Sequence, residues 1–289
     1  IDTAQVKEIQ EVSFTKRLPV SKEIINVQKD LGAKNLGQDL PILLKNQMSV
    51  VATSDAGNGV GYTGFRIRGS AGTSINVMLN GVPYNDSESQ GTFFVNIPDM
   101  ASSASQIVIQ RGVGTSSNGT ASFGASVNIL TKNPEEKPYF LTNQSAGSFN
   151  TFKHSFEAGT GKFLNNLLSV SARYSIINSD GYIDRAFSKL NSYNINALFE
   201  KGNTKLRFLT FGGKEKTYQA WNGIDKATYE SNPKFNYSGA IYDANWENII
   251  GFYDNETDNY RQNHYHLLWE QKLGKIWNLE TTFHLTHGE

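Results

Sequence analysis

The middle of the chain reads LSVSARYSI from Leu168 to Ile176, with apolar side chains at the even-numbered positions and polar ones at the odd-numbered positions. In a β-strand, successive side chains point to opposite faces. The segment therefore predicts a strand with one apolar face and one polar face. Strands of this kind build either a soluble β-sandwich or the wall of a membrane barrel.

The same alternation recurs on both sides of this segment. Strict or nearly strict alternation predicts strands with one apolar face, and the weaker examples have apolar side chains on both faces. Together they indicate about seven strands. The strong examples are 193–199, 265–269 and 277–285, and the weaker ones are 139–148, 150–160 and 204–212.

The lengths of the connections favour the barrel over the sandwich. Short connections at 161–165, 201–203 and 274–275 alternate with long ones at 178–190 and 213–261. Transmembrane barrels have tight turns at one rim and long loops at the other. A sandwich gives no reason for this order.

Composition excludes several other classes of protein. The 289 residues include no cysteine, so disulfides, thiolate nucleophiles and iron–sulfur clusters are excluded. Lys plus Arg and Asp plus Glu number 27 each, without the basic excess of a nucleic-acid-binding protein. No apolar run approaches the ~20 residues of a membrane helix. A membrane β-barrel stays open, because its strands alternate instead of being continuously apolar.

A change of composition near Asn133–Pro138 marks a boundary, since two prolines and three charged residues interrupt the pattern there. We expect an N-terminal arm over 1–17, a small α+β domain over 18–133, a linker over 134–138 and the barrel strands over 139–289.

The α+β domain is expected to contain two short helices and several strands. The helices are predicted over Ser21–Leu31 and Gln38–Gln47, the second with Asp39 as a capping residue and a proline at an early position. A hairpin is predicted at Asn80-Gly81, because Asn-Gly between apolar runs is a strong turn signal. Strands are predicted at 65–69, 75–79, 106–110 and 126–130.

Four motifs in this domain carry a family resemblance. They are IRG at Ile67–Gly69, VMLNGVP at Val77–Pro83, IVIQRG at Ile107–Gly112 and SFGASVNI at Ser122–Ile129. In order and spacing they resemble the plug domain of TonB-dependent outer-membrane receptors. Asn80 stands where that family often has Asp, which preserves the hairpin chemistry. The resemblance implies an α+β plug domain followed by antiparallel transmembrane β-barrel strands.

The length of the chain departs from this family. Its barrels close with about 22 strands, which need roughly 220 strand residues. Only 151 residues follow position 138. Because about seven strands leave open edges that lipid cannot satisfy, we expect the chain to be a fragment of a longer receptor.

The resemblance also implies roles for charged residues and for the N-terminal arm. Arg68 and Arg111 in the motif strands would pair with glutamates on the inner wall of the barrel. The extended arm resembles the box that pairs as a strand with TonB. A plain unstructured terminus is the alternative for the arm. The arm residues proposed for coupling are Glu8, Ile9, Glu11 and Val12.

Ligand contacts are expected from outward-facing plug loops and from the long barrel loops, which are rich in Tyr, Trp, Asn and Asp. The candidate ligand-binding residues are Tyr62, Tyr84, Asn85, Asp86, Phe93 and Trp221.

Other kinds of site find little support. The glycine-rich loop from Gly112 to Gly124 lacks the spacing of a nucleotide-binding fingerprint. His264 and His266 share one strand face, and with His284 they are read as lumen-facing side chains instead of metal ligands. We expect no catalytic residue, no metal and no cofactor, and no enzyme activity.

The sequence thus predicts a TonB-dependent importer in the outer membrane of a Gram-negative bacterium. The resemblance implies iron siderophores, haem or cobalamin as ligands. The expected partners are the TonB energy-transducing complex, outer-membrane lipid, a small extracellular ligand such as an iron chelate, and a surface lipoprotein, but no nucleic acid. A glycan importer of the starch-utilisation type and a soluble β-rich binding module or adhesin remain alternatives.

Overall fold

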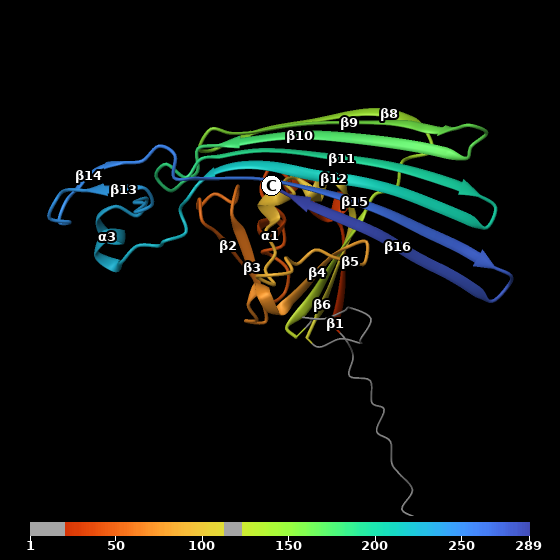
Figure 1. The fold of residues 1–289 in the computed structure, drawn as a ribbon, viewed down its shortest axis with the longest axis horizontal. Coiled ribbons are helices and arrows are strands. Elements are labelled where there is room, and N and C mark those ends of the chain that lie inside the picture. Colours follow the sequence, from red (N-terminus) through yellow and green to blue (C-terminus); the bar gives the residue numbers. More distant parts are fainter. Residues whose placement is uncertain (1–20, 113–122) are drawn as a thin grey trace, which may run out of the picture.

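The computed structural model describes residues 21–112 and 123–289. Its largest element is a seven-stranded antiparallel sheet in the order β16-β15-β12-β11-β10-β9-β8 (Figure 1), which we call the wall. Its strands are β8 (Pro138–Gly147), β9 (Thr151–Phe163), β10 (Leu168–Ser179), β11 (Ser188–Lys201), β12 (Thr204–Tyr218), β15 (Thr257–Leu273) and β16 (Trp277–Gly288). The predicted antiparallel strands are therefore confirmed.

The wall buries its polar face and exposes its apolar face. In β10, Arg173 and Ser175 are buried, whereas Tyr174 between them is 48% exposed. Phe156 lies opposite Tyr174 in the sheet and is exposed as well. A soluble sandwich does the reverse, because apolar side chains fill the space between its two sheets. A two-sheet sandwich is therefore not the architecture of this chain.

The connections at one end of the wall are all short, whereas those at the other end vary in length. The turns at 164–167, 202–203 and 274–276 lie at the first end. At the other end, β8 and β9 are joined by the short turn 148–150, β10 and β11 by 180–187, and β12 and β15 by the long segment 219–256. That segment contains α3 (Lys226–Ser231) and the hairpin of β13 (Ala240–Tyr242) and β14 (Ile249–Phe252). Across the described residues, no helix has the length and apolar character needed to cross a membrane.

The first part of the chain, which we call the plug, has a five-stranded sheet in the order β1-β6-β7-β4-β5. The β4 and β7 strands run parallel, and the other neighbours run antiparallel. The strands are β1 (Ser21–Asn26), β4 (Ile75–Leu79), β5 (Val82–Pro83), β6 (Ala104–Arg111) and β7 (Ala125–Thr131), with β2 (Val50–Ser54) and β3 (Thr63–Ile67) forming a separate hairpin. Short helical turns complete it: η1 (Val27–Leu31), η2 (Gly32–Lys34), α1 (Leu40–Leu43), η3 (Gly72–Ser74), η4 (Phe94–Asn96) and α2 (Met100–Ser103).

The predicted Asn80-Gly81 hairpin is confirmed. Both residues have positive φ, 51° and 81°, as the tight turn between two strands requires. The Asn80 side chain adds a further restraint, since its Oδ1 accepts a hydrogen bond of 2.9 Å from the backbone N–H of Thr131 in β7. The turn is thereby tied to the neighbouring strand.

The two predicted helices are shorter than expected. Ser21–Asn26 is a strand instead of a helix, because it pairs along its whole length with the edge of β6, and only Val27–Leu31 is helical. The second helix covers only Leu40–Leu43. It ends early because the next hydrogen bonds span three residues, from Lys45 N–H to the Ile42 carbonyl and from Gln47 N–H to the Leu44 carbonyl.

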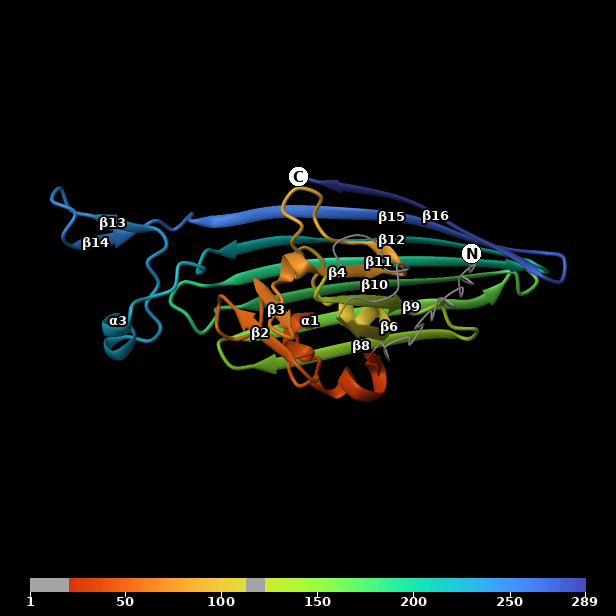
Figure 2. The ribbon, with the colours of Figure 1, turned by 90° about the horizontal axis from the view of Figure 1, so that it is seen from below.

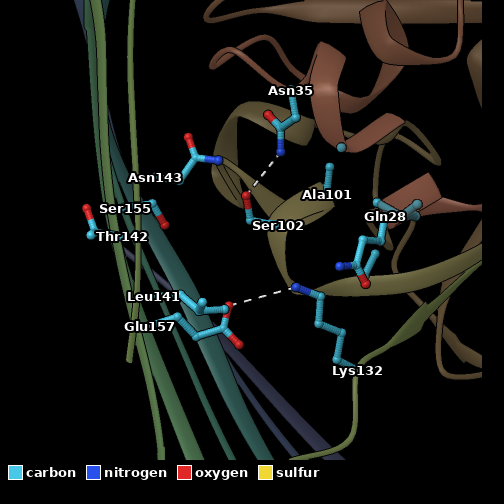
Figure 3. Close-up of a pocket in the computed structure, with 13 residues that line it drawn as sticks. Gln28, Asn35, Ala101, Ser102, Lys132, Leu141, Thr142, Asn143, Ser155 and Glu157 are labelled. Carbon is cyan, nitrogen blue, oxygen red and sulfur yellow. Dashed lines mark hydrogen bonds and ion pairs between the residues drawn. The ribbon is translucent and has the colours of Figure 1, made fainter. Parts of the chain in front are cut away.

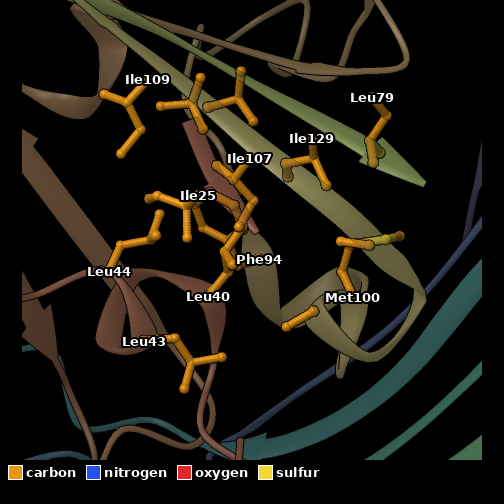
Figure 4. Packing of buried hydrophobic residues seen from close by; sticks show 14 of the residues in the cluster. Ile25, Leu40, Leu43, Leu44, Leu79, Phe94, Met100, Ile107, Ile109 and Ile129 are labelled. Carbon is orange, nitrogen blue, oxygen red and sulfur yellow. The ribbon is translucent and has the colours of Figure 1, made fainter. Parts of the chain in front are cut away.

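The apolar core lies in the plug and continues into the wall. Ile107, Ile109 and Ile129 from the plug sheet are fully buried and pack with side chains of α1, η4 and α2 (Figure 4). Full burial of such a side chain contributes about 1.5–3 kcal/mol. Leu209 and Phe211 of β12 belong to the same cluster. The plug thus lies against the concave face of the wall (Figure 2).

Candidate functional site

The carboxylate of Asp99 fastens the plug to the wall. Asp99 precedes α2 with φ of 55°, a left-handed conformation that Asp adopts more readily than most residues. Its Oδ1 lies 2.6 Å from Nζ of Lys153 in β9. Its Oδ2 lies 3.0 Å from Nη1 of Arg173 in β10. One buried carboxylate of the plug thus forms ion pairs with cations from two neighbouring wall strands.

Polar groups satisfy the remaining hydrogen-bonding capacity around Asp99. Ser175 Oγ donates to its Oδ2 at 2.8 Å, and Ser102 Oγ donates to its Oδ1. Asn35 Nδ2 donates to Asp99 Oδ1 at 3.2 Å, and Asn35 Oδ1 accepts from Lys153 Nζ at 3.1 Å. Burial alone would raise the pKa of Asp99, but the two neighbouring cations outweigh it and hold the pKa below its ordinary value. The carboxylate stays ionised.

A second polar contact holds the end of the plug sheet. Arg207 in β12 is buried, and its Nη2 donates to Thr131 Oγ1 at 2.7 Å and to the Lys132 carbonyl at 2.5 Å. Its Nε donates to Asn196 Oδ1 at 2.9 Å. Arg207 therefore bridges β7 and two wall strands.

A cavity of about 240 Å³ lies between the plug and strands β8 and β9 (Figure 3). Two interactions join residues that line this cavity. Asn35 donates a hydrogen bond to Ser102, and Lys132 forms an ion pair of 3.8 Å with Glu157. This cavity borders the Asp99 cluster and marks where the plug and the wall are less closely packed.

A further cavity lies between the plug and the wall at the end that carries the long segment 219–256. We call this space, of about 390 Å³, the apical cavity. The plug contributes loops between β2 and β3 and after β5, and the wall contributes the facing ends of β12 and β15. The residues of most interest here are Tyr62, Tyr84, Asp86, Asn96, Glu215 and Asp258.

Hydrogen bonds and ring contacts join the two sides of the apical cavity. Tyr62 Oη donates to Glu215 Oε1 at 3.2 Å, and its ring packs edge-to-face on Phe93. Tyr84 Oη donates to the Phe93 carbonyl at 2.9 Å and lies 3.3 Å from Gln262 Oε1. Burial, followed by the carboxylates of Glu215 and Asp258, raises the pKa of Tyr62 above its ordinary value, so this hydroxyl remains a proton donor.

A second cavity of about 240 Å³ adjoins the apical cavity and shares Tyr62 and Asp258 with it. Trp221 from the long connection and Asp55 from the plug line this second space. Burial raises the pKa of Asp55. Together the two cavities form one acidic and aromatic region at the rim.

Comparison with known proteins gives a family for the first part of the chain. Residues 16–126 match the family model described as the TonB-dependent receptor plug domain. The chain carries a TonB-dependent receptor plug. A search of curated protein sequences returned no match.

Solved structures of receptors share the fold. The ferric-catecholate import receptor Fiu of E. coli, in its closed form, has a TM-score of 0.69 at 16% identity, covering 94% of this chain and 37% of Fiu. FpvA of P. aeruginosa bound to heterologous pyoverdines has a TM-score of 0.67 at 11% identity, and the match covers 94% of this chain and 34% of FpvA. The ferric yersiniabactin uptake receptor FyuA of Yersinia pestis has a TM-score of 0.65 at 14% identity, and the match covers 93% of this chain and 41% of FyuA. The chain thus spans about one third to two fifths of the length of these structures and shares their fold over that part.

Four of the six candidate ligand-binding residues line the apical cavity. They are Tyr62, Tyr84, Asp86 and Phe93. Trp221 lies in the adjoining space. Asn85 has a structural role, because its side chain accepts a hydrogen bond from the Val77 N–H and donates one to the Ile75 carbonyl. Ligand contact by these residues stays a prediction.

The two arginines of the plug motifs differ in burial. Arg111 is buried and forms an ion pair with Glu23 of β1 within the plug, and its Nε donates to the Met48 carbonyl at 3.0 Å. Arg68 is exposed and has a φ of 51°. Their pairing with barrel glutamates stays a prediction. The coupling residues Glu8, Ile9, Glu11 and Val12 lie outside the described residues.

The histidines lie on the inner face of the wall. His264 is buried and stacks on the ring of Phe211, with centroids 4.6 Å apart, and His266 packs edge-to-face on the same ring. In the described part of the chain, no group of three or more His, Asp or Glu side chains is arranged to hold a metal ion. Ring packing within the wall accounts for the position of both histidines, and His264 also contacts Tyr84 of the plug, with centroids 5.4 Å apart.

The sequence analysis missed the Asp99 cluster. One signal was present, since Arg173 occupies a polar position of an alternating strand and a charge at such a position faces the interior of the wall. The partner could not be inferred, because Asp99 and Arg173 are 74 residues apart.

Proposed function

We propose that this chain is part of a receptor that imports a scarce ligand across the outer membrane of a Gram-negative bacterium, with energy supplied by the TonB complex. The proposed ligand is an iron chelate such as a siderophore, or haem or cobalamin. In this proposal the exposed apolar face of the wall contacts outer-membrane lipid, and the plug blocks the pore. A surface lipoprotein is a further proposed partner.

The observation that carries the proposal is the apical cavity between a plug and a curved wall. Its position places a bound ligand in contact with both parts, so that movement of the plug would change the contacts of the ligand. The family match to a receptor plug supports the same function. The names of the structural neighbours, which refer to ferric catecholate and ferric yersiniabactin, support an iron chelate.

The proposed path of coupling starts at the N-terminal arm. Glu8, Ile9, Glu11 and Val12 would add as a strand to TonB, because strand addition requires only an extended backbone. Arg68 and Arg111 would hold the plug until it is pulled. The proposed division into arm, plug, linker and barrel follows the boundaries at 17, 133 and 138.

Uptake by cells carrying the full-length receptor tests this function. Accumulation is measured for iron siderophores, haem, cobalamin and oligosaccharides, with and without residues 1–14, in strains with and without TonB. One ligand should accumulate only when both the arm and TonB are present. Uptake that is indifferent to both, or no uptake of any ligand, contradicts the proposal. Accumulation of oligosaccharide alone favours the glycan importer.

A further inference from the structure

The apical cavity contains many hydrogen-bond acceptors and no basic side chain. Asp86, Glu215 and Asp258 line it, and Asp55 lines the adjoining space. No Lys or Arg of the described residues lines either space. Arg185 lies behind the adjoining space, against the ring of Tyr218, with its guanidinium stacked on Phe252. The basic side chains of the described residues therefore lie outside both spaces.

The carboxylates of the cavity have no counter-charge in the described residues. Glu215 is fully buried. Its carboxylate oxygens accept hydrogen bonds only from the hydroxyl groups of Tyr62 and Thr217. Asp258 accepts from the Gln219 amide. None of these carboxylates takes part in an ion pair. A buried carboxylate without a cation is costly, so a cationic partner would stabilise the site.

An unpartnered polar atom indicates independently that the apical cavity takes a hydrogen-bond donor. Asn96 in η4 lines the apical cavity and is only 8% exposed. Its Oδ1 is buried and has no hydrogen-bond partner. Buried polar atoms are nearly always satisfied in folded proteins. A hydrogen-bond donor supplied by a ligand would satisfy this carbonyl oxygen.

We infer that the apical cavity binds a protonated amine or guanidinium group of the ligand, held by Glu215, Asp258 and the free carbonyl oxygen of Asn96. This inference rests on the proposed function and adds the chemistry of the ligand to it. Aromatic rings of Tyr62 and Tyr84 favour a cation, because their faces attract positive charge. A negatively charged chelate would instead be repelled by the carboxylates, more strongly here than in bulk water.

The test uses three ferric chelates that share one core and differ in one charge. Ferrioxamine B has a free ammonium group, its N-acetyl derivative is neutral there, and its N-succinyl derivative has a carboxylate. Dissociation constants of purified full-length receptor are measured for all three by fluorescence quenching. Spermidine is measured in parallel by calorimetry, because it has ammonium groups without an iron core.

The variants remove charge and preserve shape. Glu215→Gln and Asp258→Asn keep an oxygen to accept from Tyr62 and Gln219. Glu247→Gln is the matched control, because Glu247 is exposed on the long connection and does not line either cavity. The ammonium chelate, spermidine or both should bind the parent at least tenfold more tightly than they bind the Glu215 and Asp258 variants. The control should bind like the parent.

The inference is overturned if neither cationic probe loses affinity in the two variants, or if the succinylated chelate binds the parent most tightly. Failure of the proposed function would be seen separately, as absence of arm-dependent uptake in cells. Arm-dependent uptake of an anionic ligand, without any cation preference in the purified receptor, would preserve the function and reject the inference.

Discussion

The ammonium group of Lys153 in the wall lies 2.6 Å from the carboxylate of Asp99 in the plug, and neither side chain is exposed to solvent. Removing one partner of such a pair leaves an uncompensated buried charge, which costs about 3–5 kcal/mol. Asp99→Asn should therefore weaken plug docking strongly, because Lys153 and Arg173 both lose their counter-charge. Hydrogen exchange of plug amides in the full-length receptor measures the loss.

The matched comparison for Asp99 is an exposed ion pair. Glu230→Gln removes the partner of Lys226, where both side chains are largely exposed, and surface pairs contribute about 0–1 kcal/mol. Hydrogen exchange of the plug amides should be unchanged in this variant. Equal protection of the plug in Asp99→Asn and the parent would show that the cluster does not hold the plug.

A glycine allows the plug backbone to approach β12. A Cβ at Gly213 would lie 2.4 Å from Pro98 Cδ and 2.5 Å from the Asn96 carbonyl oxygen. Gly213→Ala should push the η4 segment away from the wall and destabilise the receptor by about 1–3 kcal/mol, as overpacking does. Urea unfolding measures the loss. Gly147→Ala is the control, because a Cβ there would make only an ordinary contact, 3.8 Å from Thr151 Cβ. This variant should keep the stability of the parent. Equal stabilities of the two variants would refute the close approach at Gly213.

Asp39 should make the stability of the plug depend on pH. Burial raises its pKa from the ordinary 3.8 to about 7. The folded state then binds more protons than the unfolded state between pH ~4 and ~7, so stability falls as pH rises through this window. The full effect is at most about 4 kcal/mol.

Asp39→Asn tests this dependence, because an amide oxygen can still accept the 3.0 Å hydrogen bond of Thr63. Thermal unfolding of the full-length receptor is followed from pH 4 to pH 8. The parent should lose stability relative to the variant as pH rises. Parallel curves for parent and variant would mean that Asp39 ionises normally.

The ion pair of Arg111 and Glu23 should hold β1 to the plug sheet. Arg111→Met removes the charge and leaves Glu23 and the Met48 carbonyl without their donor, at a cost of about 1–3 kcal/mol. Faster hydrogen exchange should be largest in β1 and in the segment near Met48. A double-mutant cycle with Glu23→Gln measures the coupling, and additive effects of the two changes would argue against the pair.

The sequence predicted the wall well and the interface poorly, for a physical reason. Alternation in segments such as 168–176 reports which face each side chain occupies, and this is a local property of a strand. The strand at Ser21–Asn26 was missed because its conformation depends on pairing with β6, far along the chain. The partners of Asp99 were missed for the same reason. The aromatic residues Tyr62, Tyr84 and Phe93 were predicted from the plug resemblance and the composition of its loops, and they line the apical cavity.

The Asp99 cluster also bears on the order in which the receptor assembles. All its members come from the chain between Asn35 and Ser175, so the plug and strands β9 and β10 suffice to form it. Shorter loops cost less entropy to close. The plug can therefore be captured by the earliest strands of the wall, and β12, β15 and β16 would then be added around a plug that is already seated.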